Sequence, residues 1–189
     1  MTVTQPSTLA GQFLIAMPAL SEPPFVRGVA FLCQHDETGA VGLLINQLSD
    51  YRLGDVLAQM QLSCDDSALA DSPVLIGGPM QQERGFVLHR EEGAWEASYR
   101  VNNEWSVTTS RDILVAIAAG RGPKHAVLAL GYAGWGAGQL EQELKDNSWF
   151  TVEASGAVVF DTPLEHRWSA AAGLVGFDPA QLAGYAGHA

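Results

Sequence analysis

The fold of this chain is organised around one stretch, AVLALGYAGWGAGQLEQELKDN, which spans residues 126–147. Its first part, up to Leu130, is a short apolar run that is typical of a buried strand. Four glycines follow within eight residues, at Gly131, Gly134, Gly136 and Gly138. Because every glycine costs backbone entropy, this density predicts a loop that needs positive φ angles or close backbone approach. A helix is then expected from about Ala137, with Leu140 and Leu144 on its apolar face.

A strand, a glycine loop and a helix in this order can present free N–H groups to an anion at the start of the helix. The candidate ligand-binding residues of this segment are Gly131, Gly134, Trp135, Gly136, Gly138 and Gln139. A nucleotide site is not expected, because Ala137 and Gly138 stand where a P-loop requires Lys and Ser/Thr, and the spacing does not match G-x-G-x-x-G. A tight turn in which Trp135 packs is the favoured interpretation, and an anion or small-ligand site is the alternative.

A second glycine segment, GGPMQQERG at residues 77–85, is expected to join two strands as a loop. Its candidate ligand-binding residues are Gly77 and Gly78. If their amides meet the first glycine segment in space, the two segments together would form a nest for a small anion. The sequence does not decide whether they meet.

Composition indicates one globular domain, with 47% hydrophobic and 16% charged residues. We expect a flexible N-terminal tail at residues 1–10 and a single domain at residues 11–189. The net charge of -11 includes only two lysines, and the arginines form no cluster. Direct binding to nucleic acid or to an anionic membrane is therefore not expected, because both depend on clustered positive charge.

The N-terminus MTVTQPSTLA lacks the basic and apolar regions of a secretory signal, and no run is suited to a membrane span. The two cysteines, Cys33 and Cys64, lie far apart and form no CxxC motif. Reduced thiols, no disulfide and a cytoplasmic location are the resulting expectations.

Along the chain, hydrophobic periodicity and turn residues predict several hairpins followed by a portion in which strands and helices alternate. Strands are expected at residues 12–17, 26–34, 40–46, 74–76, 85–90, 95–101, 105–108 and 157–161. Helices are expected at residues 52–60, from residue 109 onwards, at 167–174 and at 179–185. Together these elements predict an α+β fold, with a large mixed β-sheet, hairpins and flanking helices.

Few residues suggest catalysis. Cys33 and His35 lie two residues apart, so on a regular strand they would share a face and form a thiol with its base or the start of a metal site. His89 is the third candidate for that site, although structural roles are favoured for all three residues. No metal-ligand spacing, no GxSxG elbow and no cofactor motif is present. Glu141 and Glu143 are expected on a solvated helix face, with Gln139 and Glu143 lining a pocket as the alternative.

The segments GQFLIAMP, GAVGLLIN, GGPMQQERGFVLH, TTSRDIL and LGYAGWGAGQLEQEL, in this order, resemble the AlgH/YqgE family of bacterial proteins. The resemblance covers nearly the whole chain from Gly11 onwards. It implies a single cytoplasmic α+β domain with a large mixed sheet and no established activity or catalytic residues. Some members carry the label of transcriptional regulator of exopolysaccharide (alginate) synthesis, but no DNA-binding motif is visible in this sequence.

The sequence therefore predicts a cytoplasmic protein of regulatory or binding type, without catalytic activity or cofactor, that acts as a monomer or homodimer on a protein partner or a small anionic ligand. The first alternative is a small-ligand binder or enzyme that uses the glycine segment at residues 131–138. The second is a DNA-binding regulator, whose sign would be a concentrated basic surface.

Overall fold

The structure, a computed structural model, describes residues 8–18, 20–90 and 93–176. Its strands are β1 (Gln12–Ala16), β2 (Val29–Asp36), β3 (Gly39–Leu44), β4 (Leu48–Arg52), β5 (Pro73–Ile76), β6 (Met80–Arg90), β7 (Ser98–Arg100), β8 (Trp105–Thr108), β9 (Ala126–Gly136) and β10 (Trp149–Glu153). Its helices are α1 (Leu53–Gln59), α2 (Ser67–Ala70), α3 (Arg111–Ala118), α4 (Gln139–Lys145) and α5 (Arg167–Val175), with a π-helix η1 (Ala157–Asp161) and a 3₁₀-helix η2 (Leu164–His166).

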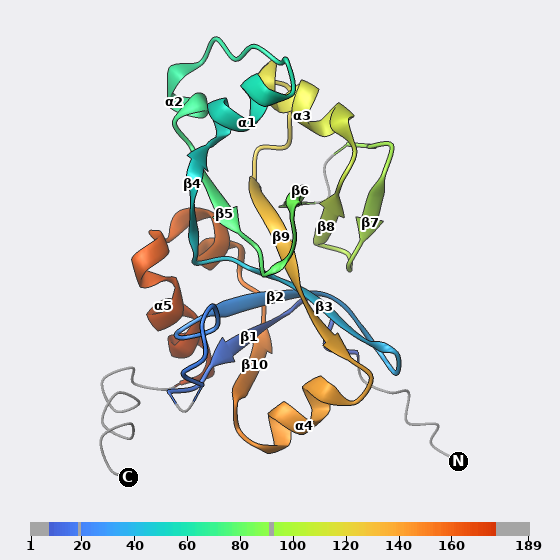
Figure 1. Cartoon of the computed structure of the whole chain (residues 1–189), viewed down its shortest axis with the longest axis vertical. Helices are drawn as coiled ribbons and strands as arrows, with labels where there is room; N and C mark the ends of the chain where they lie inside the picture. Colours follow the sequence, from blue (N-terminus) through green and yellow to red (C-terminus); the bar gives the residue numbers. More distant parts are fainter. Residues whose placement is uncertain (1–7, 19, 91–92, 177–189) are drawn as a thin grey trace.

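The strands form one sheet in the order β10-β1-β2-β3-β9-β6-β8-β7, to which β5 and β4 are attached beside β9. All pairs are antiparallel except β5 with β9, so the sheet is mixed. Figure 1 shows α1, α2 and α3 at one end of the molecule, α4 at the other and α5 along one side. The predicted α+β fold with a large mixed sheet is confirmed.

The glycine-rich segment is a strand and not the predicted loop. β9 contains Gly131, Gly134 and Gly136, and it runs through both halves of the sheet (Figure 1). Its first part pairs with β5 and β6, whereas its last part, from Ala133 to Gly136, pairs with β3. Of these glycines, Gly131 combines a positive φ with close approach of another backbone, the two causes expected from their density, whereas a Cβ at Gly134 or Gly136 would meet only ordinary contacts.

The two glycine segments meet where β9 passes from one half of the sheet to the other. Gly131 has a φ of +78°, and a Cβ added there would lie 2.6 Å from the Gly78 carbonyl oxygen and 2.8 Å from the Met80 carbonyl oxygen. A Cβ on Gly77 would in turn overlap the carbonyl oxygen of Gly131. Backbone thus packs directly on backbone at this crossing, which no residue with a side chain would allow.

Gly131 also changes which side chains of β9 face each way. Before it, Leu128 and Leu130 pack with α1 and α3; after it, Ala133 and Trp135 pack with α4. The inward face continues through both halves, with Ala129 before the glycine and Tyr132 directly after it. Since strand side chains alternate with a period of two, this change of parity requires an irregular residue at position 131.

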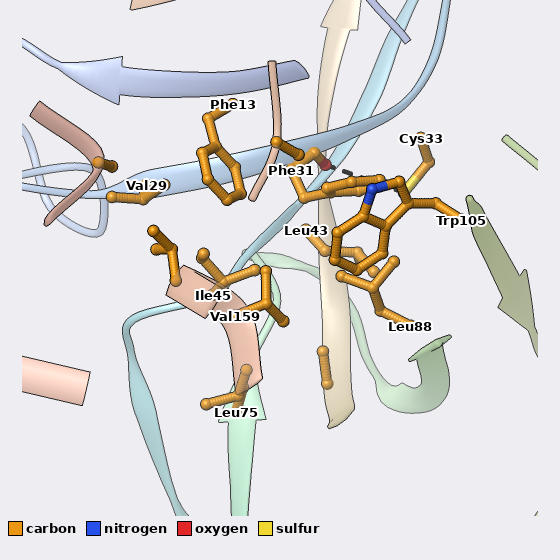
Figure 2. Close-up of a cluster of buried hydrophobic side chains, with 14 of the residues drawn as sticks. Phe13, Val29, Phe31, Cys33, Leu43, Ile45, Leu75, Leu88, Trp105 and Val159 are labelled. Atoms are coloured by element: carbon orange, nitrogen blue, oxygen red, sulfur yellow. Dashed lines mark hydrogen bonds between the residues drawn. The ribbon is translucent and has the colours of Figure 1, made fainter. Parts of the chain in front are cut away.

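The main core lies on that shared inward face. Phe13, Phe31, Leu43, Leu88 and Trp105 are fully or almost fully buried in it (Figure 2). Val158 and Val159 of η1 and Trp168 of α5 close it from the other side. The strand predicted at residues 157–161 is therefore wrong: this apolar run is a π-helix that lies on the sheet instead of joining it.

The other predicted elements agree with the structure apart from their ends and some omissions. The hairpin of β2 and β3 and the pair of β7 and β8 are confirmed. The short elements β4, β10 and α2 were not predicted from the sequence. β6 starts at Met80, so the loop expected at residues 77–85 is largely strand. The helix expected at residues 179–185 lies outside the described residues. Of the N-terminal tail expected at residues 1–10, the structure describes residues 8–10, and the Thr8 hydroxyl donates a hydrogen bond to the carbonyl of His35.

Trp135 packs in a second core cluster and is only 6% exposed. Its ring lies 5.9 Å from that of Trp149 and 6.4 Å from that of Phe25. We expect Trp135→Ala to lower the free energy of unfolding by about 3–5 kcal/mol in urea denaturation, because it leaves a cavity of aromatic size. Tyr51→Ala is the control, since Tyr51 is 44% exposed, and its cost should stay near 0.5 kcal/mol or below. A Trp135→Ala protein as stable as the wild type would contradict this role.

Candidate ligand-binding hollow

Two of the glycines named as ligand-binding candidates, Gly77 and Gly136, use their backbone amides inside the protein. The Gly77 N–H donates to the Leu130 carbonyl at 2.8 Å, and the Gly77 carbonyl accepts from Leu44 N–H at 2.7 Å. The Gly136 N–H donates to the side-chain oxygen of Gln139 at 2.9 Å. The amides expected to bind an anion are in these cases already bonded inside the protein. Helix α4 begins at Gln139, and Gly138 precedes it with a φ of +76°.

Cys33 and His35 lie on opposite faces of the sheet, so the expectation of a shared face is wrong. A β-bulge pairs Leu32 with Gly42 and Gln34 with Val41, which leaves Cys33 as an extra residue. The bulge shifts the alternation by one residue. Cys33 consequently packs in the main core beside Leu43, whereas His35 points to α4.

His35 has both ring nitrogens engaged. Its Nδ1 accepts a hydrogen bond from the Leu9 N–H at 3.1 Å, so Nε2 carries the proton and donates to the Glu141 carboxylate at 2.6 Å. This bond lowers the pKa of Glu141. Glu141 thus contacts His35 of β2 and is only partly exposed to water, whereas a fully solvated position was expected for it. This pair ties α4 to the sheet, which is a structural role.

Glu143, on the same helix, is also not on a solvated face. Burial raises the pKa of its carboxyl group, and the indoles of Trp135 and Trp149 oppose this effect. One Glu143 oxygen and the Trp149 Nε1 are buried, and among the described residues neither reaches hydrogen-bonding geometry. The carboxyl group therefore faces the Trp149 indole beneath α4, away from the hollow described below.

His89 is 1% exposed and belongs to a chain of polar groups between β6, β7 and β8. Its Nδ1 donates to the Arg90 carbonyl at 2.6 Å, so its Nε2 accepts from the Thr108 hydroxyl at 2.7 Å. The Thr108 oxygen lies 2.9 Å from that of Ser98. Cys33, His35 and His89 are therefore not brought together. Among the described residues no group of three or more His, Cys, Asp or Glu side chains is placed to hold a metal ion.

One of three cavities of similar volume in the described residues lies on the inward face of the curled sheet. It has a volume of about 520 Å³ and lies between the β2–β3 hairpin and the β7–β8 hairpin, with β6 and β9 as its floor. The helices η1 and α5 pack on the same face but contribute no residue to the cavity lining. We call this cavity the concave hollow; its lining is Cys33, Gln34, Val41, Leu43, Gln81, Arg84, Phe86, Glu96, Ala97, Ser98, Tyr99, Val107, Thr109 and Tyr132.

Aromatic rings form much of the hollow. Phe86 and Tyr132 meet edge to face at 5.8 Å, and Tyr99 is 45% exposed at the edge strand β7. The Arg84 guanidinium lies 5.4 Å above the centre of the Phe86 ring. The hollow thus combines apolar walls with one cation, Arg84, one acidic residue, Glu96, and a few neutral polar groups.

The crossing at Gly131 places the polar residues of the hollow. β6 pairs Met80 with Tyr132 and Gly85 with Leu130, so four residues, Gln81 to Arg84, stand opposite the single Gly131. The surplus residues bulge out of the ladder, and Gln81 adopts a φ of +46°. Gln81 and Arg84 therefore reach the hollow because β6 cannot follow β9 in regular register.

The fold is that of a single α+β domain with a curled, mainly antiparallel sheet that carries helices on both faces. The chain belongs to the AlgH-like family, whose family model matches residues 13–180. The resemblance noted from the sequence motifs is thereby confirmed. No helix of the described residues is long and apolar enough to cross a membrane.

Individual relatives agree with this assignment. The chain is 55% identical over 184 residues to a UPF0301 protein of Xanthomonas campestris pv. campestris (strain B100), which covers 97% of this chain and 98% of that protein. The solution structure of the AlgH protein from Pseudomonas aeruginosa matches with a TM-score of 0.79 and 43% identity, and both chains are fully covered. The crystal structure of protein DIP2367 from Corynebacterium diphtheriae has the same fold, with a TM-score of 0.71, 22% identity and coverage of 100% and 95%.

Of the residues that line the concave hollow, only Cys33 was predicted from the sequence as a site residue. Arg84 stood inside the second glycine segment, but its loop was interpreted as a connection. Phe86 and Tyr132 looked like ordinary strand residues. The available signal was the run of polar residues QQER between apolar strand positions, which indicates a segment that leaves the regular ladder.

The two thiols should differ in reactivity. Cys33 is 5% exposed, and burial raises the pKa of its thiol to about 12. Cys64 is only partly buried, and both cysteines are free. Because the thiolate is the reactive form, we expect iodoacetamide to modify Cys64 at least about tenfold faster than Cys33 in the native protein at pH 7.5. Peptide mass spectrometry over time measures both rates, and urea-unfolded protein is the control in which they should converge. Faster labelling of Cys33 would show it to be an activated thiol.

Proposed function

We propose that this protein is a non-catalytic binding protein that takes a small, partly apolar ligand in the concave hollow. The observation that supports it is the incomplete cover of the inward face. Helix η1 and Trp168 of α5 close the face over Phe13 and Phe31, while the part around Phe86 and Tyr132 stays open. Exposed aromatic surface in a hollow is costly to leave in water, and binding a ligand relieves that cost.

The size and lining of the hollow support a small molecule as the ligand. Its volume of about 520 Å³ lies in the range of about 300–1,000 Å³ that is usual for small-molecule sites. Aromatic and aliphatic side chains supply contact area, and Gln34, Gln81 and Thr109 supply neutral polar groups. Such an arrangement fixes the orientation of a ligand through a few polar contacts.

The chemistry of the lining favours binding over catalysis. Nucleophilic catalysis needs a nucleophile beside a base. Cys33 lines the hollow, but its raised pKa of about 12 keeps the thiol protonated at neutral pH. None of the described residues that line the hollow is a histidine, and the rings of His35 and His89 are bonded elsewhere.

We place this function in the cytoplasm, because two unpaired cysteines suit a reducing compartment. The label of transcriptional regulator that some relatives carry would then describe an indirect effect, in which a bound ligand changes contacts with a partner. Net charge supports the indirect interpretation, since -11 opposes phosphate binding.

A blocked hollow tests the proposal. Ala97 is exposed and lines the hollow one residue before β7, so Ala97→Trp should fill the mouth without disturbing the core. We expect thermal-shift and NMR titration with a mixed library of small metabolites to give ligands of the wild type that lose at least about tenfold in affinity in Ala97→Trp. Ala58→Trp is the matched control, because Ala58 is exposed on α1 and does not line the hollow. Ligands that bind equally to both variants, or no ligand at all, would overturn the proposed site.

Direct DNA binding should be absent. In gel-shift experiments at physiological ionic strength, the purified protein without partners should not retard any duplex in a sequence-specific way, because two lysines and dispersed arginines release few counterions. A known helix-turn-helix protein with its operator serves as the positive control. A specific shift that weakens as salt increases would show that the regulator binds DNA itself.

A further inference from the structure

We propose that the concave hollow selects a small organic acid, whose aromatic or branched apolar body lies against Phe86, Tyr99 and Tyr132 and whose single carboxylate binds Arg84. The inference rests on the proposed function above and adds the chemical class of the ligand. It depends on the position of Arg84, on its lack of an acidic partner and on the few charges around it.

Arg84 is held in place by an aromatic ring. The guanidinium lies over Phe86 at 5.4 Å from the ring centre, and the Phe86 ring is supported in turn by Tyr132 at 5.8 Å. A cation–π contact does not use the hydrogen-bond donors of a guanidinium, so the N–H groups of Arg84 stay available. Arg84 therefore offers a planar fork of donors at the hollow, already restricted in its rotation.

Two other arginines, Arg90 and Arg111, use their donors internally. Arg90 also lies over a ring, that of Trp105, but it is paired with the Glu104 carboxylate at 3.1 Å. Arg111, which lines another cavity together with Arg84, donates to the Met60 carbonyl at 3.0 Å. In the part of the chain that the structure describes, no acidic side chain comes within ion-pair distance of Arg84. We therefore expect the carboxylate of a bound ligand to be the acidic partner of Arg84.

A single carboxylate suits the charges around Arg84 better than a phosphate does. The planar fork of arginine matches the two oxygens of a carboxylate in a bidentate pair. Arg84 is the only cation among the residues that line the hollow, and Glu96 adds a negative charge to the same lining. A dianion would leave one charge uncompensated beside Glu96, in a protein of net charge -11. The remaining polar side chains, Gln34, Gln81 and Thr109, are neutral and suit hydroxyl or amide groups of the ligand body.

Matched ligand pairs test the inference. The probes are phenylacetate, 3-phenylpropionate, indole-3-acetate and 4-methylpentanoate, each with its primary amide, together with phenyl phosphate. NMR titration of the amide signals gives the affinities for the wild type, Arg84→Gln and Arg84→Lys. Arg121→Gln is the matched control, because Arg121 is exposed and does not line the hollow. Ala97→Trp reports whether binding takes place in the hollow.

We expect at least one acid to bind the wild type about tenfold or more tightly than its amide, since a charged bidentate pair is stronger than neutral hydrogen bonds. Arg84→Gln should remove this preference and leave the amide affinity unchanged, Arg84→Lys should retain part of it, and Arg121→Gln should retain all of it. Raising the salt concentration should lower the affinity for the acid and leave the affinity for the amide unchanged.

Three results would overturn the inference. If acids and amides bind equally and Ala97→Trp blocks both, the hollow is a ligand site but does not select a carboxylate. Tighter binding of phenyl phosphate than of any acid would assign Arg84 to another class of anion. If none of these probes and no member of the metabolite library binds, the proposed function fails together with this inference.

Discussion

The structure depends on one close contact between backbones, at the point where Gly77 and Gly78 cross Gly131. There β9 leaves its pairing with β5 and continues beside β3, and Gly77 joins the two pairings by donating to Leu130 and accepting from Leu44. A Cβ at Gly131 would lie only 2.6 Å from the Gly78 carbonyl oxygen, so any side chain would push the two segments apart. Because hydrogen bonds on both sides of the crossing rely on this separation, the two halves of the sheet form one layer only if glycine occupies these positions.

The same crossing explains how core and hollow share one face. The irregular residue at Gly131 turns Leu128 toward α3 and Trp135 toward α4, while Ala129 and Tyr132 both face inward. Opposite it, β6 accommodates the irregularity with four residues and thereby places Gln81 and Arg84 beside the apolar wall. A regular ladder at this position would alternate these side chains between the two faces. The polar groups of the hollow are thus a consequence of the geometry that allows the long strand to be continuous.

Local patterns in the sequence predicted the elements whose signal is local. The β2–β3 hairpin, helix α1 and the mixed α+β sheet followed from alternation, turn residues and helical spacing. The glycine strand was mistaken for a loop, because the backbone that the glycines accommodate comes from residues 77–78, about fifty positions away in the chain. The prediction that Cys33 and His35 share a face was wrong for a similar reason, because the bulge at Cys33 is defined by the pairing of β2 with β3 and not by the local sequence. Arg84 could not be recognised, because its significance lies in the missing acidic partner, which only the folded arrangement reveals.

The net charge of -11 does not prevent an anion from approaching Arg84. At physiological ionic strength, charges separated by more than about 8 Å are largely screened, so most of the acidic surface acts only weakly on the hollow. An ion pair at contact is governed by the charges in its immediate surroundings, and there the balance is one arginine against Glu96. Phe86 shields one face of the guanidinium from water, which strengthens its interaction with a partner on the open edge. A polyanion such as DNA would have to lie against the acidic surface at distances where screening is weak, so we expect repulsion to oppose it, whereas a monoanion in the hollow meets mainly the local charges.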